Sequence, residues 1–349
     1  MKFALPILDT SPTRPNYASG PRSLNSVRLL RISVTDRCNF RCIYCMPSGG
    51  LQFMPTKDIM SASDIQSVAA AARSVGIDHF KITGGEPLVR NDVVEIVRKL
   101  KKLAPKDISL TTNGVLLQNL AQPLHDAGLD RLTISLDTLN PKRFEEIVGW
   151  KGRFQLADVI HGINAAEKAG FTNIKINVVV MAGVNDDEIG KLAGLTFSKP
   201  WTIRFIEYMP LGNSQLTQRG LQSANHYTLT NQNIIDEIEA HWGSLLKIDR
   251  NLEVGVGPAH VYQIPGAIGR LGFISAMSRP FCETCNRLRL TATGDLRACL
   301  FDGGEINILK HLNKPNTYKH IIQAMENCVG LKPDTHAKMG NRAMSQLGG

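Results

Sequence analysis

Three cysteines near the N-terminus stand at a spacing that suits an iron–sulfur or metal site. The stretch TDRCNFRCIYCMP (35–47) holds Cys38, Cys42 and Cys45 at C-x₃-C-x₂-C spacing, with no fourth cysteine. Three thiolates on a tight loop can bind three irons of a four-iron, four-sulfur cluster, which leaves the fourth iron open to a small molecule. A structural zinc is the alternative, but it needs a fourth ligand, commonly His, and no His lies between Asp36 and Asp78.

A second group of cysteines lies near the C-terminus. Cys282, Cys285 and Cys299 follow the pattern C-x₂-C-x₁₃-C in CETCNRLRLTATGDLRACL, again without an obvious fourth thiolate. If one of these cysteines were the fourth ligand of a zinc bound by the first group, the second group would lack a ligand of its own. The start of the chain is a poor secretory signal, so we expect reduced thiols or metal ligands rather than disulfides. The seventh cysteine, Cys328, is expected to be a small buried residue.

Basic residues accompany the second group. Arg287 and Arg289 are two apart on a predicted strand, so both point to one face, beside Cys285. The chain of 349 residues has a formal net charge of +9. That charge favours an anionic ligand, which could be a nucleotide, a nucleic acid or an acidic surface. A solvated basic strand edge is the alternative for the two arginines alone.

Repeated strand and helix patterns must position these residues. From Val27 to about Pro210, runs of β-branched residues predict strands at 27–36, 79–85, 108–114, 131–137, 173–181 and 202–210. Amphipathic patterns between them predict helices at 63–75, 92–103, 116–127, 154–169 and 186–195. This alternation indicates a parallel sheet with right-handed crossovers. Six strands are two fewer than a closed barrel needs, so we expect an open, partial TIM-like (β/α)₆ barrel, with a doubly wound sheet as the alternative.

The polar motifs fall where such a fold binds ligands. The first cysteines follow the first strand, and TGGEP, TTNG, SLD and EYMP follow the second, third, fourth and sixth. The carboxyl ends of parallel strands meet at one rim, so we expect these motifs to lie together.

The pattern changes after Pro210. Residues 211–230 read as a loop, 231–242 as a helix, 258–264 and 269–275 as short strands, and 287–300 as a hairpin turning at 293–295. Helices are predicted near 304–312 and 316–327. We therefore expect a lead-in (1–24), a barrel core (25–230) and a smaller α+β C-terminal domain carrying the second cysteine group (231–349). No apolar run reaches the ~20 residues that span a membrane.

Two of these motifs resemble a known superfamily. CNFRCIYC is similar to the cluster loop of radical S-adenosylmethionine (SAM) enzymes, and GGEP at 84–87 is similar to their second hallmark. The second cysteine group, with TTNG, RFIEYMP and the ending MSQLGG, resembles the GTP 3′,8-cyclases of molybdenum-cofactor biosynthesis. The resemblance implies two [4Fe–4S] clusters, SAM as cofactor and GTP as substrate. A 5′-deoxyadenosyl radical would take hydrogen from C3′ of GTP, and C3′ would then attack C8.

The same resemblance assigns roles to further residues. It implies SAM contacts at Tyr44, Gly85, Ser135 and Met209, with Glu86 and Arg204 as weaker candidates. It implies GTP contacts at Arg31, Lys81, Thr111, Lys175, Arg287, Leu288 and Arg289. Phosphate binding by such side chains suits a chain without a G-x-x-x-x-G-K-[ST] loop. Lys81 and His79 replace an Arg and a Lys of many relatives, so only Lys81 is assigned to phosphate.

The family also implies partners. It suggests a reductant such as flavodoxin or ferredoxin, a downstream cyclic pyranopterin monophosphate synthase, a homodimer, a cytoplasmic location and neither nucleic acid nor membrane as partner. A Gly348-Gly349 tail is expected to enter the active-site cavity. Two alternatives stay open: another radical SAM enzyme acting on a peptide or RNA, and a zinc-stabilised nucleic-acid-binding protein.

Overall fold

The computed structural model describes residues 20–47, 49–150, 152–218, 225–249, 255–303, 305–312 and 314–348. Most of the predicted lead-in (1–24) and part of the predicted loop 211–230 lie outside these ranges.

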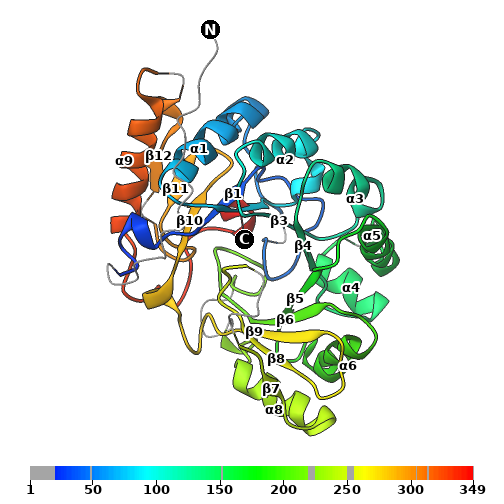
Figure 1. Ribbon diagram of the computed structural model, residues 1–349. Coiled ribbons are helices and arrows are strands. Elements are labelled where there is room, and N and C mark those ends of the chain that lie inside the picture. Colours follow the sequence, from blue (N-terminus) through cyan, green and yellow to red (C-terminus); the bar gives the residue numbers. More distant parts are fainter. Residues whose placement is uncertain are drawn as a thin grey trace.

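The six predicted core strands and five predicted core helices are present. The strands are β1 (Leu29–Ser33), β2 (His79–Thr83), β3 (Asp107–Thr112), β4 (Arg131–Ser135), β5 (Lys175–Val180) and β6 (Thr202–Glu207). The predicted helices are α1 (Ala62–Ser74), α2 (Val93–Lys101), α3 (Leu117–Asp126), α5 (Leu156–Lys168) and α6 (Ile189–Gly194). They form the outer ring in Figure 1, while the strands lie inside.

One core helix, α4 (Pro141–Val148), was not predicted. It is too short to show a clear helical period, but its start is encoded locally. The Asn140 side chain accepts hydrogen bonds from the backbone N–H groups of Lys142 and Arg143, and Pro141 occupies the first turn. Gly149 ends the helix in the left-handed conformation, with φ of 66°.

The C-terminal elements mostly agree with prediction. They are α8 (Asn231–Trp242), β7 (Leu246–Lys247), β8 (His260–Gln263), β9 (Arg270–Ile274), β10 (Arg287–Leu290), β11 (Asp295–Arg297), β12 (Glu305–Asn307), α9 (Thr317–Gly330) and α10 (Met344–Leu347). The predicted helix at 304–312 is wrong. Residues 305–307 instead pair with β11 as an edge strand, and a single 3₁₀ turn, Leu309–His311, follows.

All described strands belong to one sheet, in the order β12-β11-β10-β1-β2-β3-β4-β5-β6-β9-β8-β7. β1 to β6 are parallel and sequential, without the reversal of strand order that a doubly wound sheet requires. β10 adds to β1 and β9 adds to β6, both in parallel, but β9 and β10 do not pair with each other. The open TIM-like barrel is therefore confirmed. The sheet is continuous across the predicted boundary at 230/231, which stays a prediction.

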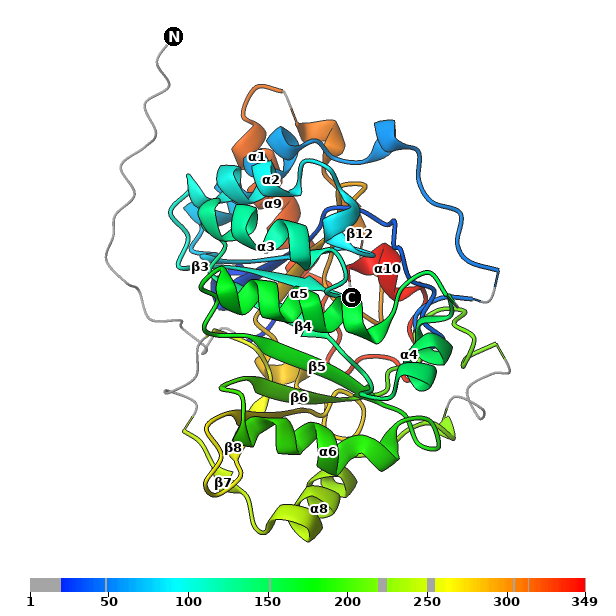
Figure 2. The same ribbon diagram turned by 90° about the vertical axis from the view of Figure 1, so that its right-hand side faces the viewer.

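The helices bury apolar faces against the outside of the sheet, and Figure 2 shows α3, α5 and α6 on that side. In α1, a capping box between Ser61 and Asp64 starts the helix, and Ile65 and Val68 are fully buried. Among the described residues, we find no helix with the length and hydropathy of a membrane-spanning segment.

Candidate active site

The rim at the carboxyl ends of the strands opens into a cavity of about 310 Å³. Its walls include all six cysteines of the two predicted groups, namely Cys38, Cys42, Cys45, Cys282, Cys285 and Cys299. It also contains residues from the ends of β2, β3, β4 and β6, as the positions of the polar motifs predicted. Residues far apart in the sequence thus line one cavity.

The first cysteine loop is held by the unpredicted helix α4. The backbone N–H groups of Arg41 and Ile43 donate to the carbonyl oxygens of Val148 (2.9 Å) and Ile147 (3.0 Å). A tight turn follows, in which Cys45 N–H donates to the Cys42 carbonyl at 2.9 Å. The spacing of the loop was visible in the sequence, but the helix that fixes its backbone was not.

The thiols of this loop suit a cationic ligand. Burial, with Glu86 nearby, raises the pKa of Cys38 to about 12. Burial and the neighbouring thiols of Cys45 and Cys38 raise the pKa of Cys42 well above its usual value. A thiolate needs positive charge to form in such a site, and bound iron supplies it. The donor set therefore fits an iron–sulfur cluster.

The second cysteine group has a more basic environment. Cys282 begins a 3₁₀ turn (Cys282–Thr284) before β10, and Cys285 directly follows that turn. The Arg287 guanidinium lies 3.8 Å from the Cys285 sulfur. Although burial raises it, Arg287 and Lys332 lower the pKa of Cys285 to about 7. The buried Lys332 also donates to the Cys285 carbonyl at 2.7 Å. Lys332 was not predicted, because nothing in its local sequence ties it to a site 47 residues away.

No three His, Cys, Asp or Glu side chains in the described ranges gather closely enough to bind one metal ion. Cluster ligands do not need that convergence, because each thiolate binds its own iron.

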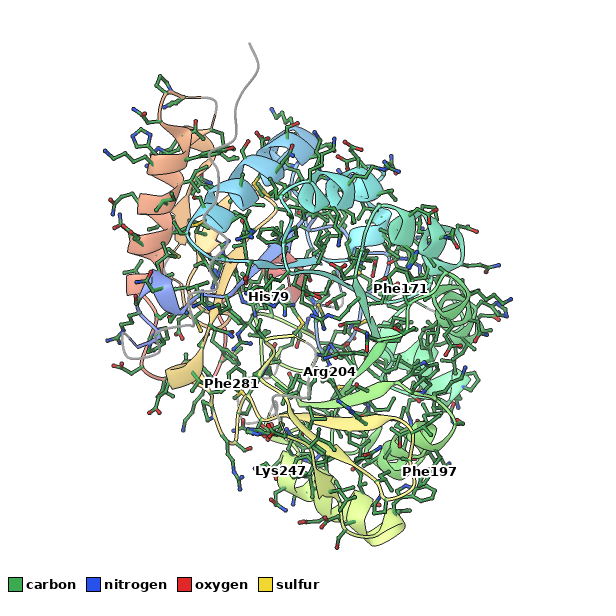
Figure 3. The ribbon with its side chains drawn as sticks, viewed as in Figure 1. His79, Phe171, Phe197, Arg204, Lys247 and Phe281 are labelled. Carbon is green, nitrogen blue, oxygen red and sulfur yellow. The ribbon has the colours of Figure 1, made fainter. Side chains whose placement is uncertain are left out.

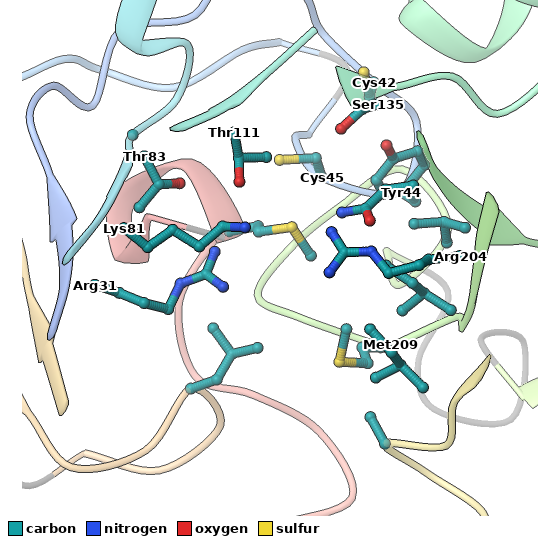
Figure 4. Close-up of a pocket in the computed structure, with 18 of the residues that line it drawn as sticks. Arg31, Cys42, Tyr44, Cys45, Lys81, Thr83, Thr111, Ser135, Arg204 and Met209 are labelled. Carbon is teal, nitrogen blue, oxygen red and sulfur yellow. The ribbon is translucent and has the colours of Figure 1, made fainter. Parts of the chain in front are cut away.

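The predicted SAM residues surround the first loop. Tyr44 donates to the Asp137 carboxylate at 2.9 Å, which ties the loop to the end of β4. Ser135, Gly85 and Met209 also line the cavity. Figure 4 shows Tyr44, Cys45 and Ser135 on one side of it.

The glycines of GGEP have a packing role in this structure. A Cβ on Gly85 would lie 2.5 Å from the Arg37 carbonyl oxygen, and one on Gly84 would lie 2.6 Å from that of Thr35. The end of β2 therefore packs directly on the backbone leading to Cys38. Glu86, whose pKa is raised to about 7 by burial, accepts hydrogen bonds from Thr112 and from the backbone of Asn113.

The predicted GTP residues form a row of cations across the sheet. Register places Arg31 of β1 beside Arg289 of β10 and beside Lys81 of β2. Burial first, then neighbouring guanidinium groups, lowers the pKa of all three, that of Arg289 to about 9. Figure 4 shows Arg31 and Lys81 pointing into one space with Arg204, which Figure 3 places inside the ring of strands. Such clustering of positive charge away from water suits an anionic ligand.

Not every predicted contact faces the cavity. The Leu288 side chain is fully buried in the core. A ligand beside Arg287 and Arg289 could therefore contact Leu288 only through its backbone. Lys175, at the start of β5, is absent from the described cavity walls but lies close enough to lower the pKa of Lys81. His79 pairs with Asp78 at 2.7 Å and likewise is not a cavity residue.

Among the uncharged side chains that line the cavity in the described structure, two have a buried polar atom without a hydrogen-bond partner. These atoms are Thr111 Oγ1 and Asn177 Oδ1. Buried polar groups are nearly always paired, so these atoms fit a polar ligand. Thr111 was predicted. Asn177 was missed, although its place two residues after Lys175 on β5 put it on the same face.

The C-terminal tail enters the cavity. The Gly348 carbonyl oxygen accepts hydrogen bonds from Arg31 at 3.3 Å and Arg289 at 3.1 Å. Figure 1 shows α10, coloured red, at the centre of the barrel. The predicted entry of the tail is observed for Gly348, while Gly349 lies outside the described residues.

Comparisons with known proteins agree with this geometry. The Radical SAM superfamily model matches residues 32–196, and the Molybdenum Cofactor Synthesis C model matches residues 201–338. The chain is 42% identical over 339 residues to the GTP 3′,8-cyclase of Microcystis aeruginosa, covering 93% of this chain and 100% of that one. It is 41% identical to the GTP 3′,8-cyclase of Pelotomaculum thermopropionicum, covering 93% and 98%.

Among solved structures, the chain is similar to Streptococcus suis SuiB bound to S-adenosylmethionine. The TM-score is 0.55 at 15% identity, with 92% of this chain and 77% of that chain covered. Similarity at this identity concerns the fold alone.

Proposed function

We propose a role for each part of the cavity in this chain. The chain belongs to the radical SAM superfamily and within it to the family of GTP 3′,8-cyclases. It is a lyase that converts GTP into (8S)-3′,8-cyclo-7,8-dihydroguanosine 5′-triphosphate, the first step of molybdenum cofactor biosynthesis. Membership of the superfamily brings SAM and an iron–sulfur cluster. The observation that carries the proposal is that both cysteine groups and the row of cations line one cavity.

In the first half of the cavity, Cys38, Cys42 and Cys45 would hold a [4Fe–4S] cluster. Tyr44, Gly85, Ser135 and Met209 lie around them and would hold SAM. The chemistry that this pair supplies when bound is one-electron cleavage of SAM and hydrogen abstraction at C3′ of GTP. The protein positions the ribose next to SAM and keeps water out of the cavity.

In the second half, Cys282, Cys285 and Cys299 would hold a second [4Fe–4S] cluster. Arg287 and Lys332 favour the thiolate form of Cys285, which a cluster requires. A nucleotide base held here would place its phosphates toward β1 and β2.

The triphosphate would bind to the row of cations. Arg31, Lys81 and Arg289 lie on neighbouring strands, with Arg204 and Lys175 nearby, and their mutual repulsion falls when several negative charges enter. Thr111 would contribute its unpartnered hydroxyl. Arg287 and the Leu288 backbone would complete the contacts beside the second cluster.

Further partners follow from the same proposal. Reduction would come from a flavodoxin or ferredoxin, and the product would pass to a cyclic pyranopterin monophosphate synthase. We also propose a cytoplasmic location and a homodimer.

Anaerobic metal analysis with EPR tests the proposal. Two clusters predict about eight irons and eight sulfides per chain, and a signal of the reduced protein that GTP alters. GTP should be turned over to the cyclised product in the presence of SAM. About four irons per chain and no spectral response to GTP would reject the second cluster and its nucleotide.

A further inference from the structure

A buried carboxylate at the end of β6, Glu207, lies at a junction of three segments. Its side chain is fully buried. One carboxylate oxygen accepts hydrogen bonds from the Asn231 backbone N–H at 3.0 Å and from the Ser278 hydroxyl. The other accepts from the backbone N–H groups of Met277 and Ser278, both at 2.8 Å. Each oxygen therefore has two donors.

The segment that Glu207 binds carries two of the three cysteines of the second group. Residues 275–286 connect β9 to β10, the two strands at the opening of the barrel, and contain Cys282 and Cys285. Ser278 precedes Cys282 by four residues, with Pro280 between them restricting the backbone. Fixing Ser278 therefore limits where Cys282 can lie.

A neighbouring contact strengthens the junction. The Asn231 side chain donates to the Ser275 hydroxyl at 2.9 Å, so the start of α8 binds the same segment. Glu207 also lies two residues before Met209 and three after Arg204, on the strand that lines the cavity. One carboxylate thus joins the SAM side of the cavity to the backbone of the second cysteine group.

A carboxylate suits this position better than a neutral amide. All of its partners at the junction donate, and charge-assisted hydrogen bonds to N–H and O–H groups are stronger than neutral ones. A glutamine has one acceptor oxygen, so its NH₂ group must face at least one backbone N–H, which then loses its acceptor. A buried N–H without a partner is unfavourable, and the loop would move to relieve it.

We propose that Glu207 is a positioning residue for the second cluster, which holds the 275–286 loop so that Cys282 and Cys285 face the cavity. The inference rests on the proposed function, because it assumes that these cysteines bind a cluster. Glu207 itself touches neither the thiolates nor the substrate in this role.

The test compares Glu207→Gln with wild type and with Glu188→Gln after anaerobic reconstitution. Glu188 is a matched control, since it is a buried carboxylate whose hydrogen-bond partners, Thr138, the Leu139 N–H and Arg143, all lie outside 275–286. We expect the iron content of Glu207→Gln to fall from about eight to about four irons per chain, and its EPR signal to stop responding to GTP. It should keep SAM cleavage in the absence of GTP, and Glu188→Gln should keep the irons of the second cluster.

Other outcomes would overturn the inference. Glu207→Gln with about eight irons and an unchanged response to GTP would show that the loop needs no carboxylate. Equal loss of both clusters in Glu207→Gln and Glu188→Gln would assign Glu207 to general stability. Wild type with about four irons would reject the proposed second cluster instead, which separates the two failures.

A milder variant covers the case in which Glu207→Gln does not fold. Ser278→Ala removes the hydroxyl donor but leaves both backbone donors of the loop. We expect a partial loss of iron confined to the second cluster, again with SAM cleavage retained. Full occupancy with an unchanged GTP-dependent signal would count against the inference.

Discussion

At the scale of single residues, the cavity brings several buried cationic side chains together, among them Arg31, Lys81 and Arg289. Arg289, Arg31 and Lys81 face one another across adjacent strands because they occupy the same register position. Alternation along β10 places Arg287 and Arg289 on that side and sends Leu288 into the core. The chemistry at this scale is electrostatic binding of an anion.

Replacing Arg289 with alanine should weaken GTP binding without preventing SAM cleavage. The loss of one charged hydrogen-bonding group is worth about 1.5–3 kcal/mol, so the KM for GTP should rise roughly 10- to 150-fold. Steady-state kinetics with GTP, together with SAM cleavage measured without it, would check this. Arg98→Ala, on the exposed side of α2, is the control. Normal GTP turnover by Arg289→Ala would mean that the substrate lies elsewhere.

The environment of Asp78 should make the free energy of unfolding depend on pH. Burial by itself raises its pKa, but hydrogen bonds from His79 (2.7 Å) and Lys106 (2.8 Å) outweigh burial and hold the pKa below its ordinary value. Because the folded pKa is the lower one, this carboxylate stabilises the fold above its unfolded pKa, about 3.9. That stability is lost as the pH falls through the folded pKa.

Asp78→Asn should therefore lower the thermal midpoint at pH 7, by an amount equivalent to about 1–2 kcal/mol. The difference from wild type should close as the pH drops below about 4. Thermal unfolding followed by circular dichroism at several pH values would measure both. Asp126→Asn changes an exposed carboxylate and should show little effect. A pH-independent difference would contradict the argument.

At the scale of elements, α4 and its capping glycine support the first cysteine loop. A Cβ on Gly149 would lie 2.4 Å from the Arg41 carbonyl oxygen, and its φ is +66°. Gly152 shares the left-handed conformation, with φ of +73°, but has no atom within 4 Å of such a Cβ. Comparing substitutions at the two glycines therefore distinguishes the effect of backbone strain from the effect of contact with the cysteine loop.

Gly149→Ala should displace the loop and reduce both iron content and SAM cleavage, whereas Gly152→Ala should only lose about 1–2 kcal/mol of stability. Iron analysis and SAM cleavage without GTP measure the loop, and thermal unfolding measures the strain. Equal iron loss in both variants would show that α4 does not position the cysteines.

How far the sequence predicts these elements depends on whether their signals are local. The core strands and long helices were predicted because β-branched runs and helical periods span many residues. The short helix α4 and strand β12 have fewer residues than a period needs, and β12 exists only because β11 pairs with it. The two cysteine groups could be recognised from the sequence, because the spacing of their cysteines is a local pattern. Glu207 and Lys332 act on segments 71 and 47 residues away, so no local pattern indicates them.

At the scale of the whole molecule, the barrel stays open between β9 and β10, and distant parts of the chain meet in the opening. The loop from β9 to β10 brings in Cys282 and Cys285, Cys299 follows β11, and the tail lines the same cavity through Met344. The tail is held on its way by two backbone hydrogen bonds, from Gly340 N–H to Pro210 (2.9 Å) and from Gly212 N–H to Gly340 (3.0 Å). The fold thus fixes the position of Gly348 through contacts made well before it.

Gly348 gives the last prediction, because its place allows no side chain. Its φ is +67°, and a Cβ would lie 2.8 Å from Ser33 Cβ and 2.9 Å from Thr83 Cγ2. Gly348→Ala should move the carbonyl that Arg31 and Arg289 share, and a displacement near 1 Å in an active site lowers turnover roughly 10- to 100-fold. Iron content and SAM cleavage without GTP should stay near wild type, since the carbonyl and the Cβ position of Gly348 meet residues of β1, β2 and β10. Gly266→Ala, with φ of +81° and open space around it, controls for strain. Because the tail reaches the cations and not the thiolates, loss of iron in Gly348→Ala would contradict this division of roles.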